Sequence, residues 1–277
     1  SHAIARRLDR ITFEQYVDWF TLPPWFADLL YSGVRCVWSQ HPERMSLLYV
    51  LWYMKTNGGF SAMFNDQEGS PQQYGLRCGL GGLAEAMAQD LRSDVCLNRP
   101  AAHVESVEDG YLVHTAREVF SCRNVVVATT PWVSRHIDFT PELAPARQLL
   151  MNQPPGFAIK ASLIYNTPWW RMGAGPEDHV FAWLNGRGKY GIDWALDSST
   201  PGAEQYTLVC FVSPEFVDGL EDNEGVWAQA VAQAMVALTQ NEQARGFTQY
   251  RIVDWRKQKY IEGGPNTNFE PGVLTAS

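Results

Sequence analysis

The spacing of apolar residues changes along the chain, and this change limits the fold more than any other feature of the sequence. Over about the first 65 residues apolar side chains recur on one helical face, as Phe13, Tyr16, Val17 and Phe20 do. From about residue 95, short apolar runs alternate with turns rich in Pro, Gly, Asn and Asp, which is typical of strands. The sequence therefore predicts an α+β fold, with a mixed, largely antiparallel sheet flanked by helices.

Capping and stop signals set the limits of the predicted helices. Thr12 and Gln15 have the spacing of a capping box, and Pro23-Pro24 ends the helix that they begin. A glycine turn at 79–82 leads into another helical pattern, and because no convincing strand precedes this turn, it is not the dinucleotide-binding fingerprint. The helices expected on these grounds lie around residues 13–20, 25–37, 46–56, 83–91 and 227–238.

Two groups of strands are expected. The first is a meander followed by Val125-Val126-Val127-Ala128, which is apolar throughout and reads as a central strand buried on both faces. The second group forms a separate, largely antiparallel sheet on which the 227–238 helix packs. The expected strands cover residues 101–107, 111–115, 119–122 and 125–128 in the first group, and 157–165, 179–184, 190–196, 206–213 and 248–255 in the second.

Composition excludes several classes of function. The 277 residues contain 22 Lys and Arg against 30 Asp and Glu, a net charge of −8 that argues against nucleic-acid binding. The longest apolar run, eight residues at 47–54, is too short to span a bilayer, which needs about 20. The five cysteines show no zinc-ligand spacing and form no even disulfide framework, so neither a metal site nor a disulfide scaffold is expected, and a cytoplasmic location fits best.

Residue types alone give few catalytic candidates. The six histidines lie apart, without the HExxH or GxSxG patterns of metalloproteases and serine hydrolases. Lys160 stands out because it interrupts the apolar strand FAIKASLIY directly after Pro154-Pro155-Gly156. Lysines are seldom fully buried, so an ordinary lysine at a sheet edge or facing solvent is the simpler interpretation.

Six segments, taken together, resemble the flavin-containing monoamine oxidase family in order and spacing. The resemblance runs from about Thr12 to the end of the chain, and six pieces in the same order are far more specific than any one of them. The segments are LLYVLWYMKTNGG, GLGGLAEAMAQDL, LNRPAAHVE, VVVATTPWVSRHIDFTPELAP, PPGFAIKASLIYNTPWWR and VDWRKQKYIEGGPNTNFEPGVLT.

The resemblance implies a role for several residues near an FAD. Lys160 matches a lysine that holds a water against the flavin, and Trp255 matches a tryptophan beside the isoalloxazine ring. Ala101 matches a position that contacts the adenine end. Gly264 and Pro265 belong to the loop in which covalent members carry a cysteine, so Pro265 implies that the FAD is non-covalent.

The resemblance also implies substrate positions and a division of the chain. Asn266 replaces a residue that often supplies an aromatic wall of the amine cage, and Phe64 and Gln72 match substrate-facing positions. The implied division is residues 1–70 as the helical part of the substrate domain, 71–135 as a partial FAD-binding α/β domain with a β-meander, 136–250 as the substrate-binding sheet and helix, and 251–277 as a return to the FAD domain.

The family's GxGxxG turn and its C-terminal FAD segment are absent from the 277 residues. Two interpretations stay open: a piece of a longer oxidase, or a relative that no longer binds FAD. The implied activity is oxidation of an amine or amino acid to an imine, with dioxygen as second substrate and release of peroxide. The oligomeric state stays open, with a homodimer as one alternative. The alternatives are a flavin-free binding or scaffold protein, and a cofactor-independent enzyme that uses Lys160 as base.

Overall fold

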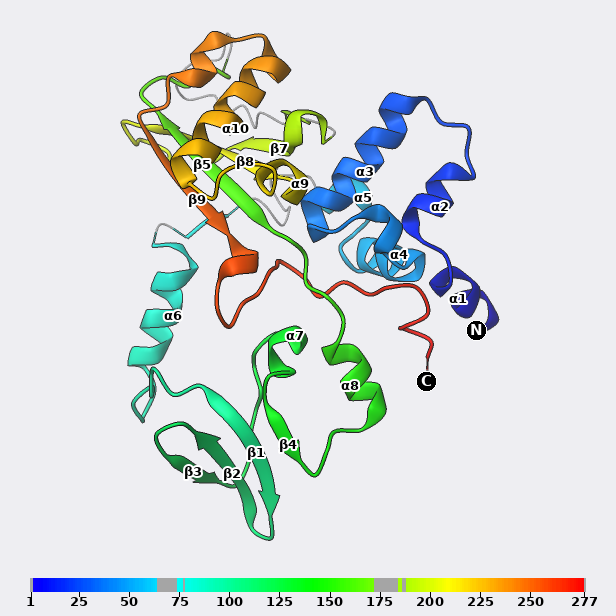
Figure 1. Cartoon of the computed structure of the whole chain (residues 1–277), viewed down its shortest axis with the longest axis vertical. Helices are drawn as coiled ribbons and strands as arrows, with labels where there is room; N and C mark the ends of the chain where they lie inside the picture. The colour runs from blue at the N-terminus through cyan, green and yellow to red at the C-terminus, as the bar shows by residue number, and fades with distance from the viewer. Residues whose placement is uncertain (1, 64–73, 77, 172–183, 186–187, 277) are drawn as a thin grey trace.

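The computed structural model describes residues 2–63, 74–76, 78–171, 184–185 and 188–276. Helices from the N-terminal part lie beside a five-stranded sheet, and a smaller sheet with its own short helices forms the opposite end of the molecule (Figure 1). The C-terminal segment runs between the two ends and finishes close to the N-terminus (Figure 1). This arrangement confirms the predicted α+β fold with mixed and antiparallel sheets.

The N-terminal helices enclose a hydrophobic core of their own, around the fully buried Val34, Trp38 and Leu47. The capping box is confirmed, because the Thr12 side chain accepts a hydrogen bond from the Gln15 N–H and the Gln15 side chain accepts one from the Thr12 N–H. The helices are α1 (His2–Asp9), α2 (Phe13–Asp18), α3 (Pro24–Trp38), η1 (Pro42–Arg44), α4 (Leu47–Thr56) and α5 (Phe60–Met63).

The larger sheet has the strand order β6-β7-β8-β5-β9, and every neighbouring pair is antiparallel. Helix α10 (Glu224–Thr239) covers one face, where Trp227, Val231 and Met235 pack on buried strand residues (Figure 1). The strands are β5 (Ile159–Tyr165), β6 (Leu184–Asn185), β7 (Ile192–Asp197), β8 (Tyr206–Val212) and β9 (Gln249–Asp254), with η2 (Lys189–Gly191), α9 (Pro214–Val217) and η3 (Glu242–Arg245) between them.

The smaller sheet contains the expected meander and one strand that the sequence did not reveal. Its order is β3-β2-β1-β4, with β1 antiparallel to β2 but parallel to β4. Beside it lie two short helices that were also missed. The elements are β1 (Ala101–Val107), β2 (Gly110–Thr115), β3 (Val119–Cys122), α7 (Pro131–Ser134), β4 (Asp138–Thr140) and α8 (Pro145–Met151).

Two predictions for the region before and after the meander are wrong. Residues 125–128 form no strand and are not buried, and Val126 is 87% exposed, because no described segment pairs with them. The helix α6 (Gly79–Gln89) begins at the first glycine rather than after the glycine turn, and none of its residues is buried. Apolar side chains in both segments therefore face outward.

The C-terminal segment connects β9 to the N-terminal helices and packs against them. Phe269 packs against the N-terminal core, and its carbonyl accepts a hydrogen bond from the Ser46 N–H. The buried carboxylate of Asp9 accepts hydrogen bonds from the Ser46 hydroxyl at 2.6 Å and from the Thr275 hydroxyl at 2.8 Å. These contacts fix the segment that follows β9 against the helices, and this segment contains the loop with Gly264.

Candidate active site

Lys160 lies inside the larger sheet, not at its edge. It is the second residue of β5, where it faces Phe211 of β8 on one side and Val253 of β9 on the other. Its neighbours Ile159 and Ala161 point into the core under α10, so strand alternation places Lys160 on the opposite face. We call this the open face: the side of the sheet away from α10, which carries Lys160, Phe211 and Val253.

The Lys160 ammonium sits over an aromatic ring. Its Nζ is 4.7 Å from the centroid of the Phe211 ring, within the range of a cation–π contact. Burial of the ammonium lowers the Lys160 pKa, while the negative charge that Cys36 would carry as a thiolate raises it. Solvent still reaches the side chain, which weakens the effect of burial on the pKa. Within the described residues the Lys160 ammonium makes no ion pair.

A crossing of three chain segments fixes the position of Lys160. Gly156 contacts the end of α3 and the loop at Gly264 so closely that a Cβ at Gly156 would lie 2.2 Å from the Trp38 carbonyl oxygen. The Gly264 N–H donates to the Gly156 carbonyl at 2.8 Å, and the Gly156 N–H donates to the Asn266 carbonyl at 3.1 Å. The Pro-Pro-Gly turn therefore locks the start of β5 to the Gly-Gly loop.

Trp255 lies at the same end of the sheet. Ile159 faces Asp254 across the β5–β9 pair, and the Trp255 N–H donates to the Ala158 carbonyl at 3.3 Å. Trp255 opens η4 (Trp255–Lys257) and is half-buried. Antiparallel pairing, which the sequence alone could not specify, thus brings Trp255 next to the strand that carries Lys160.

The predicted site residues fall into three groups. Lys160, Trp255, Gly264, Pro265 and Asn266 gather around the crossing, where the Asn266 side-chain amide donates to the Val37 carbonyl at 3.2 Å. Ala101 begins β1 in the smaller sheet. Phe64 and Gln72 lie outside the described residues.

An ion-pair network that the sequence did not reveal joins α3 to the sheet. Arg35 donates from Nε to the Asp193 carboxylate at 2.8 Å, and Asp193 is 1% exposed. Burial raises the Asp193 pKa, and the charge of Arg35 opposes that shift. Arg35 Nη1 also lies 2.8 Å from His41 Nδ1, and His41 Nε2 lies 3.1 Å from Glu215. No sequence signal connects residues this far apart.

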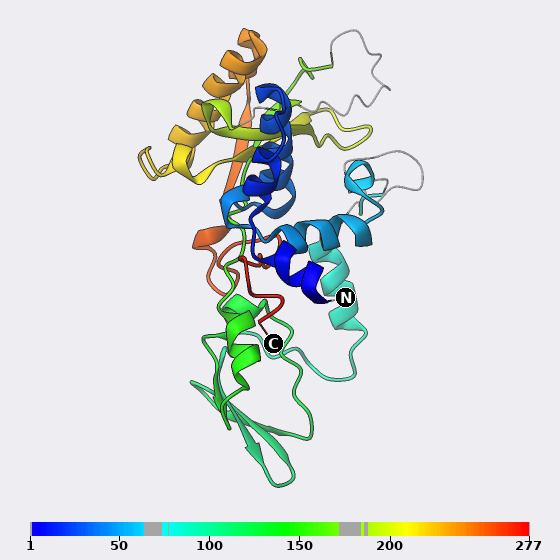
Figure 2. The same cartoon turned by 90° about the vertical axis from the view of Figure 1, so that its right-hand side faces the viewer.

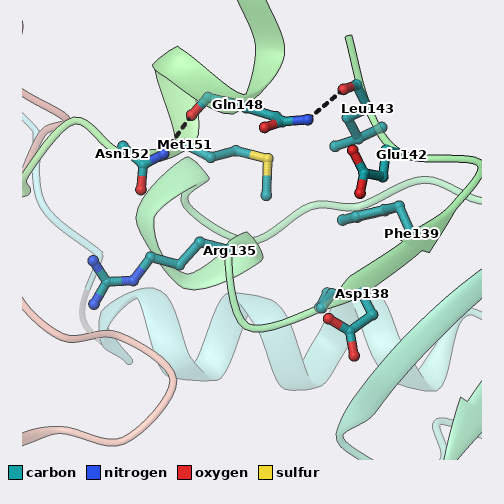
Figure 3. A pocket seen from close by; sticks show the side chains of 9 residues that line it. Arg135, Asp138, Phe139, Glu142, Leu143, Gln148, Met151 and Asn152 are labelled. Atoms are coloured by element: carbon teal, nitrogen blue, oxygen red, sulfur yellow. Dashed lines mark hydrogen bonds between the residues drawn. The ribbon is translucent and has the colours of Figure 1, made fainter. Parts of the chain in front are cut away.

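A cavity at the other end of the molecule does not compete with Lys160 as a reaction site. It lies among α7, β4 and α8 and has a volume of about 370 Å³. In its lining, Gln148 bonds to the Leu143 carbonyl and Asn152 to the Gln148 carbonyl, while the Arg135 guanidinium points away from Asp138 and Glu142 (Figure 3). These lining groups do not converge on a point where a substrate atom could react.

Two further observations concern metal binding and membrane crossing. Among the described residues, no group of three or more His, Cys, Asp or Glu side chains could hold a metal ion, and all five cysteines are free. None of the helices in the described part of the chain has both the length and the hydropathy that crossing a membrane requires.

Comparison with known proteins identifies the family of the chain. The family described as flavin-containing amine oxidoreductase matches residues 18–275, and the chain belongs to that family. It is 24% identical to flavin-containing amine oxidase A of Canis lupus familiaris over 98% of this chain and 51% of the relative. It is 25% identical to an L-amino acid dehydrogenase of Synechocystis, again over 98% of this chain and 55% of the relative.

Solved structures show the same fold. Cyclohexylamine oxidase from Brevibacterium oxydans superposes with a TM-score of 0.81 at 23% identity, covering 98% of this chain and 59% of that one. Wild-type putrescine oxidase bound to putrescine gives a TM-score of 0.81 at 22% identity, covering 100% of this chain and 60% of that one. The chain thus spans about half the length of the curated relatives and about 60% of the solved structures.

Proposed function

We propose that this protein takes part in FAD-dependent oxidation of an amine, with Lys160 facing the flavin. One observation carries the proposal: the Lys160 ammonium lies on the open face, without an ion pair among the described residues, on the strand whose start is held to the Gly-Gly loop through Gly156. Family membership supports a flavin as the cofactor and an amine and dioxygen as reactants.

The residues around the crossing fit the ring end of a flavin. A cation held over Phe211 and a half-buried indole at Trp255 lie at one end of the sheet, where a planar aromatic group could contact both. Gly264 has a φ of +155°, and a Cβ there would approach only Ala158, at 3.9 Å, so its backbone leaves room for a ligand. Ala101 would contact the adenine end.

When bound, FAD would supply the redox chemistry: it would accept a hydride from the carbon that bears the amine while the nitrogen gives up a proton, and it would pass two electrons, with two protons, to dioxygen as hydrogen peroxide. Water would hydrolyse the imine. Lys160 would hold a water beside the flavin, and its positive charge would stabilise negative charge that develops on oxygen. Trp255 would orient the ring, while Asn266, Phe64 and Gln72 would face the substrate.

Pro265 has no nucleophilic side chain, so we propose that the FAD is non-covalent. Residues 71–135 and 251–277 would contribute to the FAD domain, and residues 1–70 and 136–250 to the substrate domain. The free cysteines support a reducing, cytoplasmic setting.

The test is whether the purified protein, titrated with FAD at micromolar and higher concentrations, produces a saturable change in the flavin absorbance band near 450 nm. Anaerobic addition of an amine should then bleach this band, and air should restore it. A flavin spectrum that the protein leaves unchanged at every FAD concentration would favour a flavin-free binding protein or a cofactor-independent enzyme.

A further inference from the structure

The open face of the larger sheet carries two cationic residues on neighbouring strands. Lys160 of β5 faces Val253 of β9, and Ser162 faces Arg251. Ile252 packs into the core under α10, so alternation places Arg251 and Val253 on the open face with Lys160. Lys160 and Arg251 are therefore diagonal neighbours, whose Cα atoms lie about 7–8 Å apart in such a pair.

The described strands place no carboxylate on this face that is free to pair with Lys160 or Arg251. Alternation gives the open face mainly uncharged side chains, such as Ser162, Val209 and Phe211. Asp193, at the β-bulge of β7, is already held by Arg35. Arg251 is exposed and makes no ion pair with any described residue. In a chain with a net charge of −8, two cations without a partner acid form a local positive surface.

We infer that Arg251 binds the carboxylate of the substrate, and that the substrate class is therefore amino acids. This inference rests on the proposed function, because it places the substrate on the face that carries Lys160. A guanidinium binds a carboxylate through two parallel hydrogen bonds, which fixes both the position and the orientation of the α-carbon.

The same charges select against other amines. A diamine would bring a second ammonium toward Lys160 and Arg251, where like charges repel. A simple monoamine would leave the guanidinium without its anion. Hydrogen bonds to a charged group correspond to about tenfold to a hundredfold in affinity, and this is the preference expected for an amino acid over the amine formed by its decarboxylation.

Matched pairs of ligands test this inference in protein supplied with FAD. Phenylalanine is compared with phenethylamine, and ornithine with putrescine, by the concentration dependence of anaerobic flavin bleaching. Each amino acid should act at a concentration at least about tenfold lower than its amine. Arg251→Gln should raise the concentration that each amino acid requires by about tenfold or more, because the carboxylate loses its partner. The same variant should lower the concentration that putrescine requires, because a repelling charge is gone. Arg245→Gln, at an exposed arginine of η3, should keep the wild-type preference in both pairs.

Equal responses to the amino acid and the amine of each pair in wild-type protein would overturn the inference. Arg251→Gln would also overturn it if flavin bleaching by the amino acid and by the amine weakened equally, because that is the result expected of an arginine with only a structural role. Bleaching by amines alone would overturn the inference but keep the proposed function. If no ligand bleaches the flavin, the proposed function fails, and benzoate titration without FAD decides the inference. Saturable binding lost in Arg251→Gln supports a carboxylate site, and absence of binding overturns it.

Discussion

Lys160 depends on two neighbours for its position: Phe211 across the strand pair and Gly156 four residues earlier. The sequence identified the lysine because it interrupts an apolar strand. It could not identify Phe211, because the β5–β8 register is set by pairing between residues about 50 positions apart. Of the two places expected for an ordinary lysine, a sheet edge or a solvent-facing position, the structure has the second, because β5 is an internal strand and the side chain is exposed.

Pro265 predicts that FAD is released when the protein is denatured. Because a proline side chain has no nucleophile, FAD bound to this protein should leave when acid or heat denatures it. The measurement is flavin absorbance in the supernatant after precipitation. Flavin that remains in the pellet would contradict a non-covalent link.

His41 predicts a pH dependence of stability. Burial, and then the charge of Arg35, lower its pKa from the ordinary 6.5, with Glu215 opposing the shift. The unfolded chain therefore takes up the proton first as pH falls, so the free energy of unfolding should decrease below about pH 6.5, by at most about 1.4 kcal/mol per pH unit. Protonation would also add a hydrogen at Nδ1, which faces Arg35.

Urea unfolding between pH 5 and 8 checks this effect. The His41→Asn variant should show a flatter dependence on pH than wild type between about pH 5 and 6.5. His136→Asn, at an exposed histidine after α7 that pairs with Glu262, serves as the control. Identical pH profiles for wild type and His41→Asn would refute the assignment.

At the scale of elements, the sequence predicted those whose partners lie nearby in the chain. The capping box at Thr12, the meander strands from Ala101 to Cys122 and the helix around Trp227 all form as expected. The strand predicted at residues 125–128 does not form. Four consecutive apolar residues become a buried strand only if another strand pairs with them, and no described strand does. The three-residue strand β4 is too short to show a pattern.

The close contacts of Gly156 with the end of α3 and with the Gly264 loop predict how a substitution there changes stability. A Cβ there would lie 2.2 Å from one carbonyl oxygen and 2.3 Å from another, at Trp38 and Gly264, and backbone atoms on both sides cannot easily move. Gly156→Ala should therefore lower the free energy of unfolding by more than about 2 kcal/mol. Gly81→Ala, where a Cβ meets nothing within 4 Å, should be neutral or stabilising by up to about 1 kcal/mol. Chemical denaturation of both variants measures the difference, and equal stabilities would contradict the packing described.

At the scale of the whole molecule, one end is less enclosed than the other. The larger sheet and the N-terminal helices have buried cores, whereas α6 has no buried residue and its Leu80 is 77% exposed. The smaller sheet projects away from the helices in both views (Figures 1 and 2). The exposed apolar side chains of α6 and of residues 125–127 lie in the region that we propose contributes to the FAD domain.

This openness predicts a low affinity for FAD in the 277-residue chain. Pyrophosphate groups are usually held by a helix that a glycine turn joins to a strand, but residues 74–76 before α6 form no strand. Losing three charge-assisted hydrogen bonds costs at least about 4.5 kcal/mol, more than a thousandfold in affinity. Calorimetric titration should give a dissociation constant in the micromolar range or weaker, and submicromolar binding would contradict the account.

The central claim is that Lys160 faces the flavin, and stopped-flow measurement of the two half-reactions tests it most directly. In FAD-loaded protein, Lys160→Met should slow flavin reoxidation by dioxygen, because the positive charge that stabilises the developing negative charge on oxygen is gone. Anaerobic reduction by substrate should change much less, and Lys55→Met, at an exposed lysine of α4, should change neither step. Equal reoxidation rates for wild type and Lys160→Met would contradict the claim and make Lys160 an ordinary strand lysine.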